Sequence, residues 1–279
     1  MCLNDQNFEH KFANIHLSGP CNRRCYFCIG QHMMALDALN TLNQWPLPGI
    51  EDFVTACVEQ GVTEVNLTGS NTDPTLYQHL PELTTYLRTH IPGVRLGIRT
   101  NAVKKDFPHW NLFDKGSVSF CSTNPETYRA MMGCGDPPDI PQLLRDTASW
   151  ENLKINIILG PENTGENYMD LVTTLADLSD MGVRKVNLRE PYGQPHVGNP
   201  YGAVMPQGTH FGMPLYHLSE MEITYWDVHY VEVDSLNLYA SGRMDSHYSV
   251  SQGHADTGEV HDQSYWSKAG RHVKQWTSF

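Results

Sequence analysis

The feature that most constrains the fold of this chain is the alternation of short apolar or β-branched runs with longer segments of helical periodicity. Such short runs are typical of buried strands, and the segments between them are long enough to form helices that pack on a sheet. Strands connected in this way run parallel, because each helix returns the chain to the edge where the preceding strand began. The sequence therefore predicts an α/β fold with strands at residues 13–18, 64–68, 94–99, 117–121, 154–159 and 184–189.

Helices are predicted between these strands, at Ile50–Gln60, 76–88 and 167–181. Residues 191–214 are rich in glycine and proline, which favours a long loop after the sixth strand. A β-hairpin formed by residues 229–233 and 236–240 follows, and then a polar tail. We therefore expect a core at residues 1–190 and a C-terminal extension at 191–279 that covers the mouth of the core.

Charge and hydropathy narrow the range of partners. The formal net charge of −12 argues against nucleic acid, since no cluster of Lys and Arg offsets it. No stretch approaches the ~20 apolar residues that span a bilayer, and the opening MCLNDQNFEH lacks the apolar run of a signal peptide. We expect a cytoplasmic protein that binds neither nucleic acid nor membrane. In a reducing compartment, clustered cysteines indicate metal or redox chemistry more often than disulfides.

Three of the seven cysteines lie within the stretch CNRRCYFC, directly after the first predicted strand. A tight loop can turn the thiols of Cys21, Cys25 and Cys28 toward one point. A structural zinc ion takes four ligands, commonly from two separated pairs, and this chain has no second CxxC pair. An iron–sulfur cluster held by three cysteines has one iron without a protein ligand, and a small molecule can bind that iron.

The stretch CNRRCYFC resembles the Cx3CxΦC motif of the radical S-adenosylmethionine (SAM) superfamily. Further segments resemble its MoaA-like branch, in order along the chain. NLTGSNTDPTLY at 66–77 is similar to the glycine-rich segment, RTNA at 99–102 to the turn after the third strand, and SVSFCSTNPETYRAMMG at 117–133 to the fourth strand and its helix. The resemblance covers residues from about 13 to 190. It implies a partial (βα)6 barrel, a [4Fe-4S] cluster, SAM as cofactor and an external one-electron donor of the flavodoxin or ferredoxin type.

The resemblance also implies roles for individual residues. Cys21, Cys25 and Cys28 bind iron, the glycine-rich segment receives the methionine ammonium, and the Arg-Glu pair that ends the sixth strand grips the SAM carboxylate and a ribose hydroxyl. The residues expected to contact SAM are Phe27, Gly69, Ser70, Asn71, Asn101, Ser122, Arg189 and Glu190.

Some of these residues have a structural alternative. Asn71 and Asp73 serve equally well as turn formers, and Ser122 and Arg189 can make strand-end hydrogen bonds or a surface ion pair. No cysteine follows Cys134, which argues against an auxiliary cluster and against the molybdenum-cofactor reaction of the MoaA-like enzymes.

Tyr192 and His196 lie in the loop beyond the sixth strand and are candidates for substrate contact or proton transfer. The expected reaction is reductive cleavage of SAM to a 5′-deoxyadenosyl radical, which abstracts hydrogen from a small polar or nucleotide-like metabolite. One alternative is a radical SAM enzyme that matures a peptide or protein. Another is a non-catalytic iron–sulfur or zinc protein that acts as a sensor or scaffold. Polar residues after successive predicted strands favour an enzyme, because these positions meet at one edge of a parallel sheet.

Overall fold

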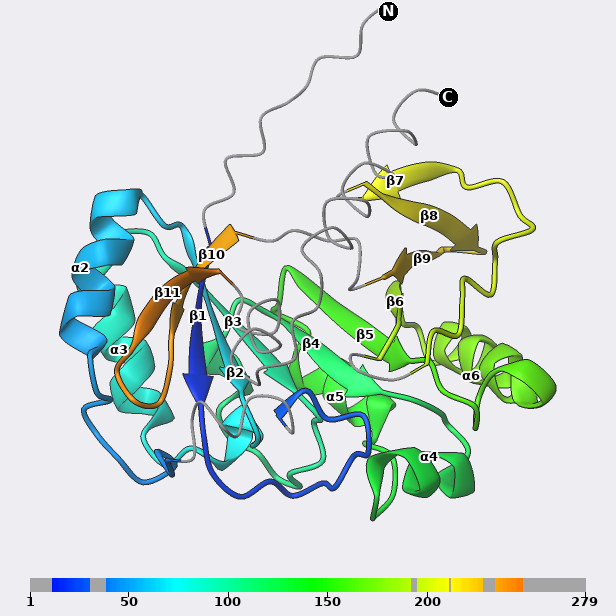
Figure 1. Cartoon of the computed structure of the whole chain (residues 1–279), viewed down its shortest axis with the longest axis horizontal. Coiled ribbons are helices and arrows are strands. Elements are labelled where there is room, and N and C mark those ends of the chain that lie inside the picture. The colour runs from blue at the N-terminus through cyan, green and yellow to red at the C-terminus, as the bar shows by residue number, and fades with distance from the viewer. Residues whose placement is uncertain (1–11, 31–38, 192–194, 211, 228–233, 248–279) are drawn as a thin grey trace, which may run out of the picture.

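The structure is a computed structural model that describes residues 12–30, 39–191, 195–210, 212–227 and 234–247 (Figure 1). All six predicted strands are confirmed, each within two residues of its expected bounds. They are β1 (Phe12–Leu17), β2 (Glu64–Gly69), β3 (Arg95–Thr100), β4 (Lys115–Phe120), β5 (Asn152–Ile158) and β6 (Lys185–Arg189). Each pairs in parallel with the next along the chain. The predicted α/β fold with a parallel sheet is therefore confirmed.

Helices cover one face of this sheet (Figure 1). Helix α2 (Ile50–Gln60) has the predicted bounds, and Gly61 ends it in the left-handed region at φ 67°. The remaining helices are α3 (Leu80–His90), α4 (Pro125–Met132), α5 (Ile140–Asp146) and α6 (Tyr168–Asp180), with short 3-10 turns at Pro74–Leu76, Trp110–Leu112 and Gly165–Asn167. In the described part of the chain, none of the helices combines the length and apolar character needed to cross a membrane.

The helix predicted at 76–88 is wrong at its start. Asp73 caps a separate 3-10 turn over Pro74–Leu76, since its side chain accepts a hydrogen bond from Thr75 N at 3.0 Å. Helix α3 then begins at Leu80, with a proline in its first turn. The aspartate and the proline therefore divide what the apolar periodicity presents as one helix.

The glycine- and proline-rich region is not the uninterrupted loop that its composition predicts. It contains β7 (Gly208–His210) and the start of β8 (Met213–Leu218), which pair antiparallel. β8 pairs in turn with β9 (Met221–Trp226), and β9 runs parallel to β6. The extension therefore lengthens the sheet beyond the sixth strand, as the yellow strands of Figure 1 show.

The predicted hairpin of 229–233 with 236–240 is also corrected. Its second half corresponds to β10 (Asp234–Leu238), which pairs antiparallel with the following strand β11 (Met244–His247). On its other side β10 runs parallel to β1. Both edges of β10 are thus occupied, and residues 228–233 lie outside the described part. Among the strands that the structure describes, the order β11-β10-β1-β2-β3-β4-β5-β6-β9-β8-β7 is open at both ends.

The two faces of the sheet differ in chemistry because side chains alternate along each strand. Ile98, Val118 and Ile155 are at most 1% exposed and belong to the core shared with the helices. The side chains on the opposite side are polar or charged, and they are buried or partly buried. This side is called the polar face below, and it includes Glu64, Asn66, Arg95, Arg99, Lys115, Ser117, Lys154, Asn156, Lys185, Asn187 and Arg189.

Candidate functional site

The three-cysteine loop, residues 21–28, begins just after β1 at the carboxyl edge of the sheet and runs beneath the strand ends toward α4 in Figure 1. Its entry is tied to the segment after β2. Asn71 Oδ1 accepts a hydrogen bond from Gly19 N at 2.9 Å, and Thr72 Oγ1 donates to the carbonyl of Pro20 at 2.7 Å. The loop is therefore fixed over the ends of the first two strands.

The middle of the loop is held by the end of α4. Arg24 N donates to the carbonyl of Met132 at 3.0 Å. A Cβ atom on Gly133, which has φ 78°, would lie 2.3 Å from the carbonyl oxygen of Arg24, so this close approach requires glycine. Cys134 follows, with its Sγ 3.7 Å from the carbonyl oxygen of Asn22.

The three cysteine thiols are close enough for their charges to interact. Cys21 is exposed, whereas Cys25 and Cys28 are partly buried and joined by a hydrogen bond from Cys28 N to the Cys25 carbonyl at 3.2 Å. Burial, together with the charges of Cys28 and Cys21, raises the pKa of Cys25 to about 12. Burial also raises the pKa of Cys21, with smaller contributions from Asp73 and Cys28. A positively charged metal centre reverses this preference, because it stabilises thiolates.

The donor set suits an iron–sulfur cluster. In a four-iron cluster each thiolate binds a different iron, so the ligands lie around separate corners. Within the described ranges, no group of three or more Cys, His, Asp or Glu side chains could hold a single metal ion. Cys21, Cys25 and Cys28 are three soft thiols on one loop, which is the donor chemistry that iron in such clusters takes.

Ser70 is the predicted SAM contact whose surroundings most resemble an incomplete binding site. It is 2% exposed, and its hydroxyl has no hydrogen-bond partner among the described residues. The chain is packed tightly here: a Cβ on Gly69 would lie 1.8 Å from the carbonyl oxygen of Thr72, and one on Gly30 would lie 2.2 Å from that of Ser70. An unpaired buried hydroxyl is costly, so a polar ligand group at this position would stabilise it.

The side chain of Asn71, in contrast, forms hydrogen bonds within the protein. Its Oδ1 accepts from Ser18 Oγ and from Gly19 N, both at 2.9 Å. These hydrogen bonds correspond to the turn-forming role that is the alternative to SAM contact for this residue. Its contact with SAM stays a prediction.

Asp73, for which the sequence offered a turn-forming role as an equal alternative, is a central residue of the site. It is 2% exposed, and its carboxylate accepts hydrogen bonds from Thr75 Oγ1 at 2.6 Å, from Thr100 Oγ1 at 2.8 Å and from Asn101 N at 2.6 Å. These donors come from the segment after β2 and from the end of β3. Asp73 therefore fixes two strand ends of the site relative to each other.

Asn101 is brought into contact with the three-cysteine loop. Its Nδ2 donates to Asn22 Oδ1 at 2.7 Å and lies 4.0 Å from Cys21 Sγ. The structure thus places the predicted residue after β3 beside the loop after β1. Asn22, inside the motif but between the cysteines, is a contact that the motif alone did not reveal.

Two further predicted residues have different surroundings. Phe27 is partly buried and packs edge-on against Tyr26, whose hydroxyl donates to Glu162 at 2.8 Å. Ser122 is fully buried, and its Oγ accepts from Asn124 N at 2.9 Å and from Thr174 at 3.3 Å. The Ser122 hydroxyl therefore makes the strand-end hydrogen bonds of the structural alternative, and its contact with SAM stays a prediction.

Arg189 and Glu190 lie at the end of β6, and the Glu190 carboxylate has several donors. It accepts from Val197 N at 3.0 Å, from Gly198 N at 2.7 Å and from Tyr225 Oη at 2.8 Å. Glu190 is 2% exposed. In this structure it therefore holds residues 197–198 against β9, and its contact with a ribose stays a prediction.

His196 belongs to the same group of residues. Its Nε2 lies 3.0 Å from Asp227 Oδ2, just after β9, and 3.8 Å from Glu190 Oε1. The imidazole is half exposed, whereas both carboxylates are buried. A histidine held by a buried carboxylate can transfer protons, which suits the role predicted for it. Tyr192 lies outside the described residues.

Neither a protein-family model nor a curated protein sequence matches this chain. Its fold is similar to that of SuiB from Streptococcus suis, with a TM-score of 0.50 and 15% identity, over 67% of this chain and 41% of SuiB. Coproporphyrinogen III oxidase (HemN) from Escherichia coli, described as a radical SAM enzyme, has a TM-score of 0.48 and 18% identity, over 67% and 45% of the two chains. Methylornithine synthase (PylB) has a TM-score of 0.47 and 16% identity, over 70% and 57%.

The aligned part spans less than half of SuiB. Because the sequence identities are low, the similarity to these structures is a similarity of backbone fold only. The chain therefore has an α/β fold with a mostly parallel sheet, and its backbone path is similar to part of SuiB.

Proposed function

We propose that this protein is a radical SAM enzyme that binds a [4Fe-4S] cluster through Cys21, Cys25 and Cys28 and acts on a small polar or nucleotide-like metabolite. The observation that carries the proposal is the gathering of the three-cysteine loop with the ends of β2 and β3. The hydrogen bonds of Asn101 to Asn22 and of Thr72 to Pro20 connect these three segments. The likeness of the fold to SuiB, which has been crystallised with bound S-adenosylmethionine, supports it.

When bound, the cluster and SAM would supply the radical chemistry. This is reductive cleavage of SAM to a 5′-deoxyadenosyl radical that abstracts hydrogen from the substrate. The residues of this chain would bind and orient the cluster and SAM. Ser70 offers a buried hydroxyl with no other described partner, and Asn101 lies beside the loop. Arg189, partly buried at the end of β6, is the proposed partner of the SAM carboxylate. His196 is proposed to hold or transfer a proton at Nε2.

The polar face favours a small polar substrate over a peptide. Several charged side chains on it are partly buried on one face of the sheet, and a few convergent polar groups are typical of sites that bind small molecules. The MoaA-like resemblance, the cytoplasmic location and a flavodoxin- or ferredoxin-like electron donor belong to the same proposal. A non-catalytic cluster or zinc protein is the alternative that one experiment separates from it.

That experiment is reductive cleavage of SAM. Protein reconstituted anaerobically with iron and sulfide, then reduced with dithionite and given SAM, is expected to release 5′-deoxyadenosine and methionine, measured by liquid chromatography with mass spectrometry. A sensor or scaffold protein would release neither product above the level of a protein-free control. If iron is incorporated at about four atoms per chain and no 5′-deoxyadenosine forms, the proposed function is wrong.

A further inference from the structure

The polar face concentrates positive charge in an otherwise acidic protein. The net charge of the chain is −12, with only 19 Lys and Arg. Six of them lie on the polar face of the described strands: Arg95, Arg99, Lys115, Lys154, Lys185 and Arg189. The polar face therefore carries a local concentration of positive charge, although the net charge of the chain is negative.

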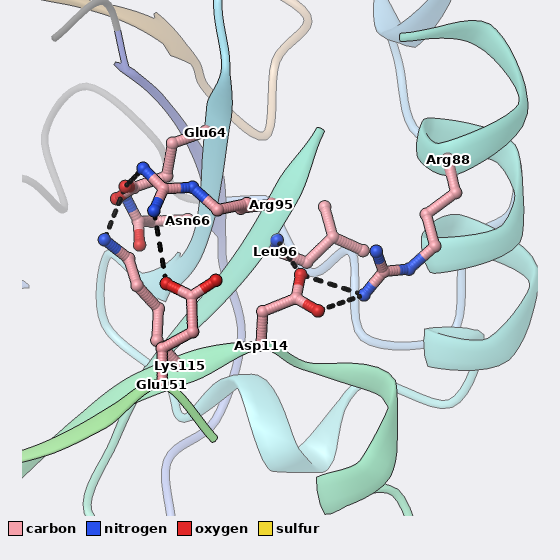
Figure 2. A network of polar contacts seen from close by, with 8 residues as sticks. All are labelled: Glu64, Asn66, Arg88, Arg95, Leu96, Asp114, Lys115 and Glu151. Carbon is pink, nitrogen blue, oxygen red and sulfur yellow. Dashed lines mark hydrogen bonds and ion pairs between the residues drawn. The ribbon is translucent and has the colours of Figure 1, made fainter. Parts of the chain in front are cut away.

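Some of these cations are neutralised at the amino ends of the strands, as Figure 2 shows. Glu64 on β2 forms an ion pair with Lys115 and lies 3.6 Å from Arg95. Arg95 also contacts Glu151 at 3.1 Å. These pairs neutralise one another at the amino ends of β2, β3 and β4, so little net charge is left there for a ligand.

Lys154 and Arg99 differ from this edge group. Within the described ranges, neither makes a hydrogen bond or an ion pair, although each is partly buried. Lys185 contacts Glu222 at 3.7 Å, and both of those side chains are near half exposed. Lys154 and Arg99 are therefore the cations of the polar face whose charge is least compensated.

The sheet register places these two side chains so that they can act together. Arg99 on β3 pairs with Ser117 on β4, and Ser117 pairs with Lys154 on β5. Neighbouring strands are ~4.8 Å apart, so the Arg99 and Lys154 backbones are about 10 Å apart on the same face. Long Arg and Lys side chains can both reach an anion held above Ser117, whose hydroxyl can also donate to it.

The local electrostatics favour binding of an anion near Lys154. Burial, together with the charges of Lys185, Lys115, Arg189 and Arg99, lowers the pKa of Lys154 to about 8. At pH 7 the ammonium therefore stays mostly protonated but is repelled by its neighbours. A bound anion would remove this repulsion, and the free energy so released would contribute to binding.

The position suits a substrate that extends toward the three-cysteine loop. Lys154 lies four residues before Ile158, the end of β5, which is about 13 Å along the strand. Neutral polar side chains lie between, including Asn156 and Asn187, which hydrogen-bond to each other at 3.1 Å. A small molecule with an anionic group at Lys154 would therefore direct its other end to the strand ends where SAM is proposed to bind.

We propose that the polar face binds the anionic group of the substrate, a phosphate or carboxylate, through Lys154 and Arg99 with Ser117 between them. As a statement about the substrate it rests on the proposed function, whereas anion binding itself can be measured without any reaction. The substrate class is then a small anionic metabolite.

The test uses the full reconstituted chain at low ionic strength and pH 7, with tripolyphosphate, inorganic phosphate and citrate as probes and sodium chloride at matched ionic strength as the control. Calorimetry is expected to detect saturable binding of at least one probe. Phosphate probes and citrate distinguish the two anion types. Lys154→Gln and Arg99→Gln should each weaken binding about tenfold or more, because each removes a charged contact.

Arg184→Gln is the matched control, since Arg184 pairs with Glu220 at 3.0 Å on the surface and its loss removes the same charge. Its affinity should stay within about twofold of the wild type. Without anion, Lys154→Gln should melt no lower than the wild type, because it removes repulsion; this separates lost binding from a damaged fold. Absence of saturable binding, unchanged affinity in Lys154→Gln, or an equal loss in Arg184→Gln would overturn the inference.

The two proposals fail in different ways. A protein that cleaves SAM but binds none of the probes overturns the anion site alone. A protein that binds the probes through Lys154 but releases no 5′-deoxyadenosine overturns the proposed function and leaves the anion site in place.

Discussion

Replacement of Cys25 by alanine is expected to abolish both the visible absorption of the reconstituted protein and its release of 5′-deoxyadenosine. Cys25 is the middle thiol of the loop in sequence, and burial together with the charges of both Cys28 and Cys21 raises its pKa, so the three thiols are close enough to interact. Two remaining thiolates cannot hold a four-iron cluster firmly. Absorbance near 400 nm, iron content and 5′-deoxyadenosine should each fall to the level of unreconstituted protein, a loss of about 100-fold or more in activity.

Cys134→Ser is the matched control for this experiment. The Cys134 thiol lies beside the loop, 3.7 Å from the Asn22 carbonyl, and is exposed. If three thiolates bind the cluster, Cys134→Ser keeps the absorbance, the iron and the activity. Loss of the metal in both variants would mean four thiol ligands and no open iron, and zinc in place of iron would confirm the structural-metal alternative.

Asp73→Ala is expected to destabilise the fold more than any other single change in the site. Its carboxylate is buried and accepts hydrogen bonds from Thr75, Thr100 and the Asn101 backbone. Alanine leaves these buried donors unpaired, which costs about 3 kcal/mol of unfolding free energy. The melting temperature should fall by about 6 to 12 °C, measured by circular dichroism.

The control is Asp136→Ala. Asp136 is an exposed aspartate paired with Arg129 at 3.3 Å, and loss of such a surface pair should change the unfolding free energy by less than about 0.5 kcal/mol. If Asp73→Ala melts within 2 °C of Asp136→Ala, as about 0.5 kcal/mol would give, Asp73 does not hold the strand ends together.

The core of the fold could be predicted from the sequence because its signals are local. Each of the six strands is a short apolar run, and helix α2 has an apolar stripe that ends at Gly61. The strands at the two edges gave weaker signals. β7 and β8 lie among glycines and prolines, and β10 joins β1 across more than 200 residues. Pairing over such a separation depends on which sheet edge is left open, which no local pattern records.

The site could be predicted only in part, for a related reason. The motif identifies the three cysteines, and strand ends identify Ser70 and Asn101. The sequence does not show which polar side chains form hydrogen bonds within the protein itself. The hydroxyl of Ser122 accepts a hydrogen bond from α6, and the carboxylate of Glu190 accepts hydrogen bonds from residues 197–198 and from β9. The sequence does not place these donors nearby.

The cations of the polar face were missed although a signal exists. Arg95 and Arg99 on β3, and Lys115 on β4, alternate with apolar residues at a period of two. In strands covered by helices on one side, that period marks a second, solvated face. Charged residues at alternate strand positions would therefore have indicated a polar interior.

The most direct measurement of the central claim is electron paramagnetic resonance of the reconstituted, dithionite-reduced protein with and without SAM. We expect the spectrum of a reduced four-iron cluster whose g values shift when SAM is added, because SAM binds an iron that has no cysteine ligand. A protein without such a spectrum, or one whose spectrum is the same with and without SAM, would contradict the account.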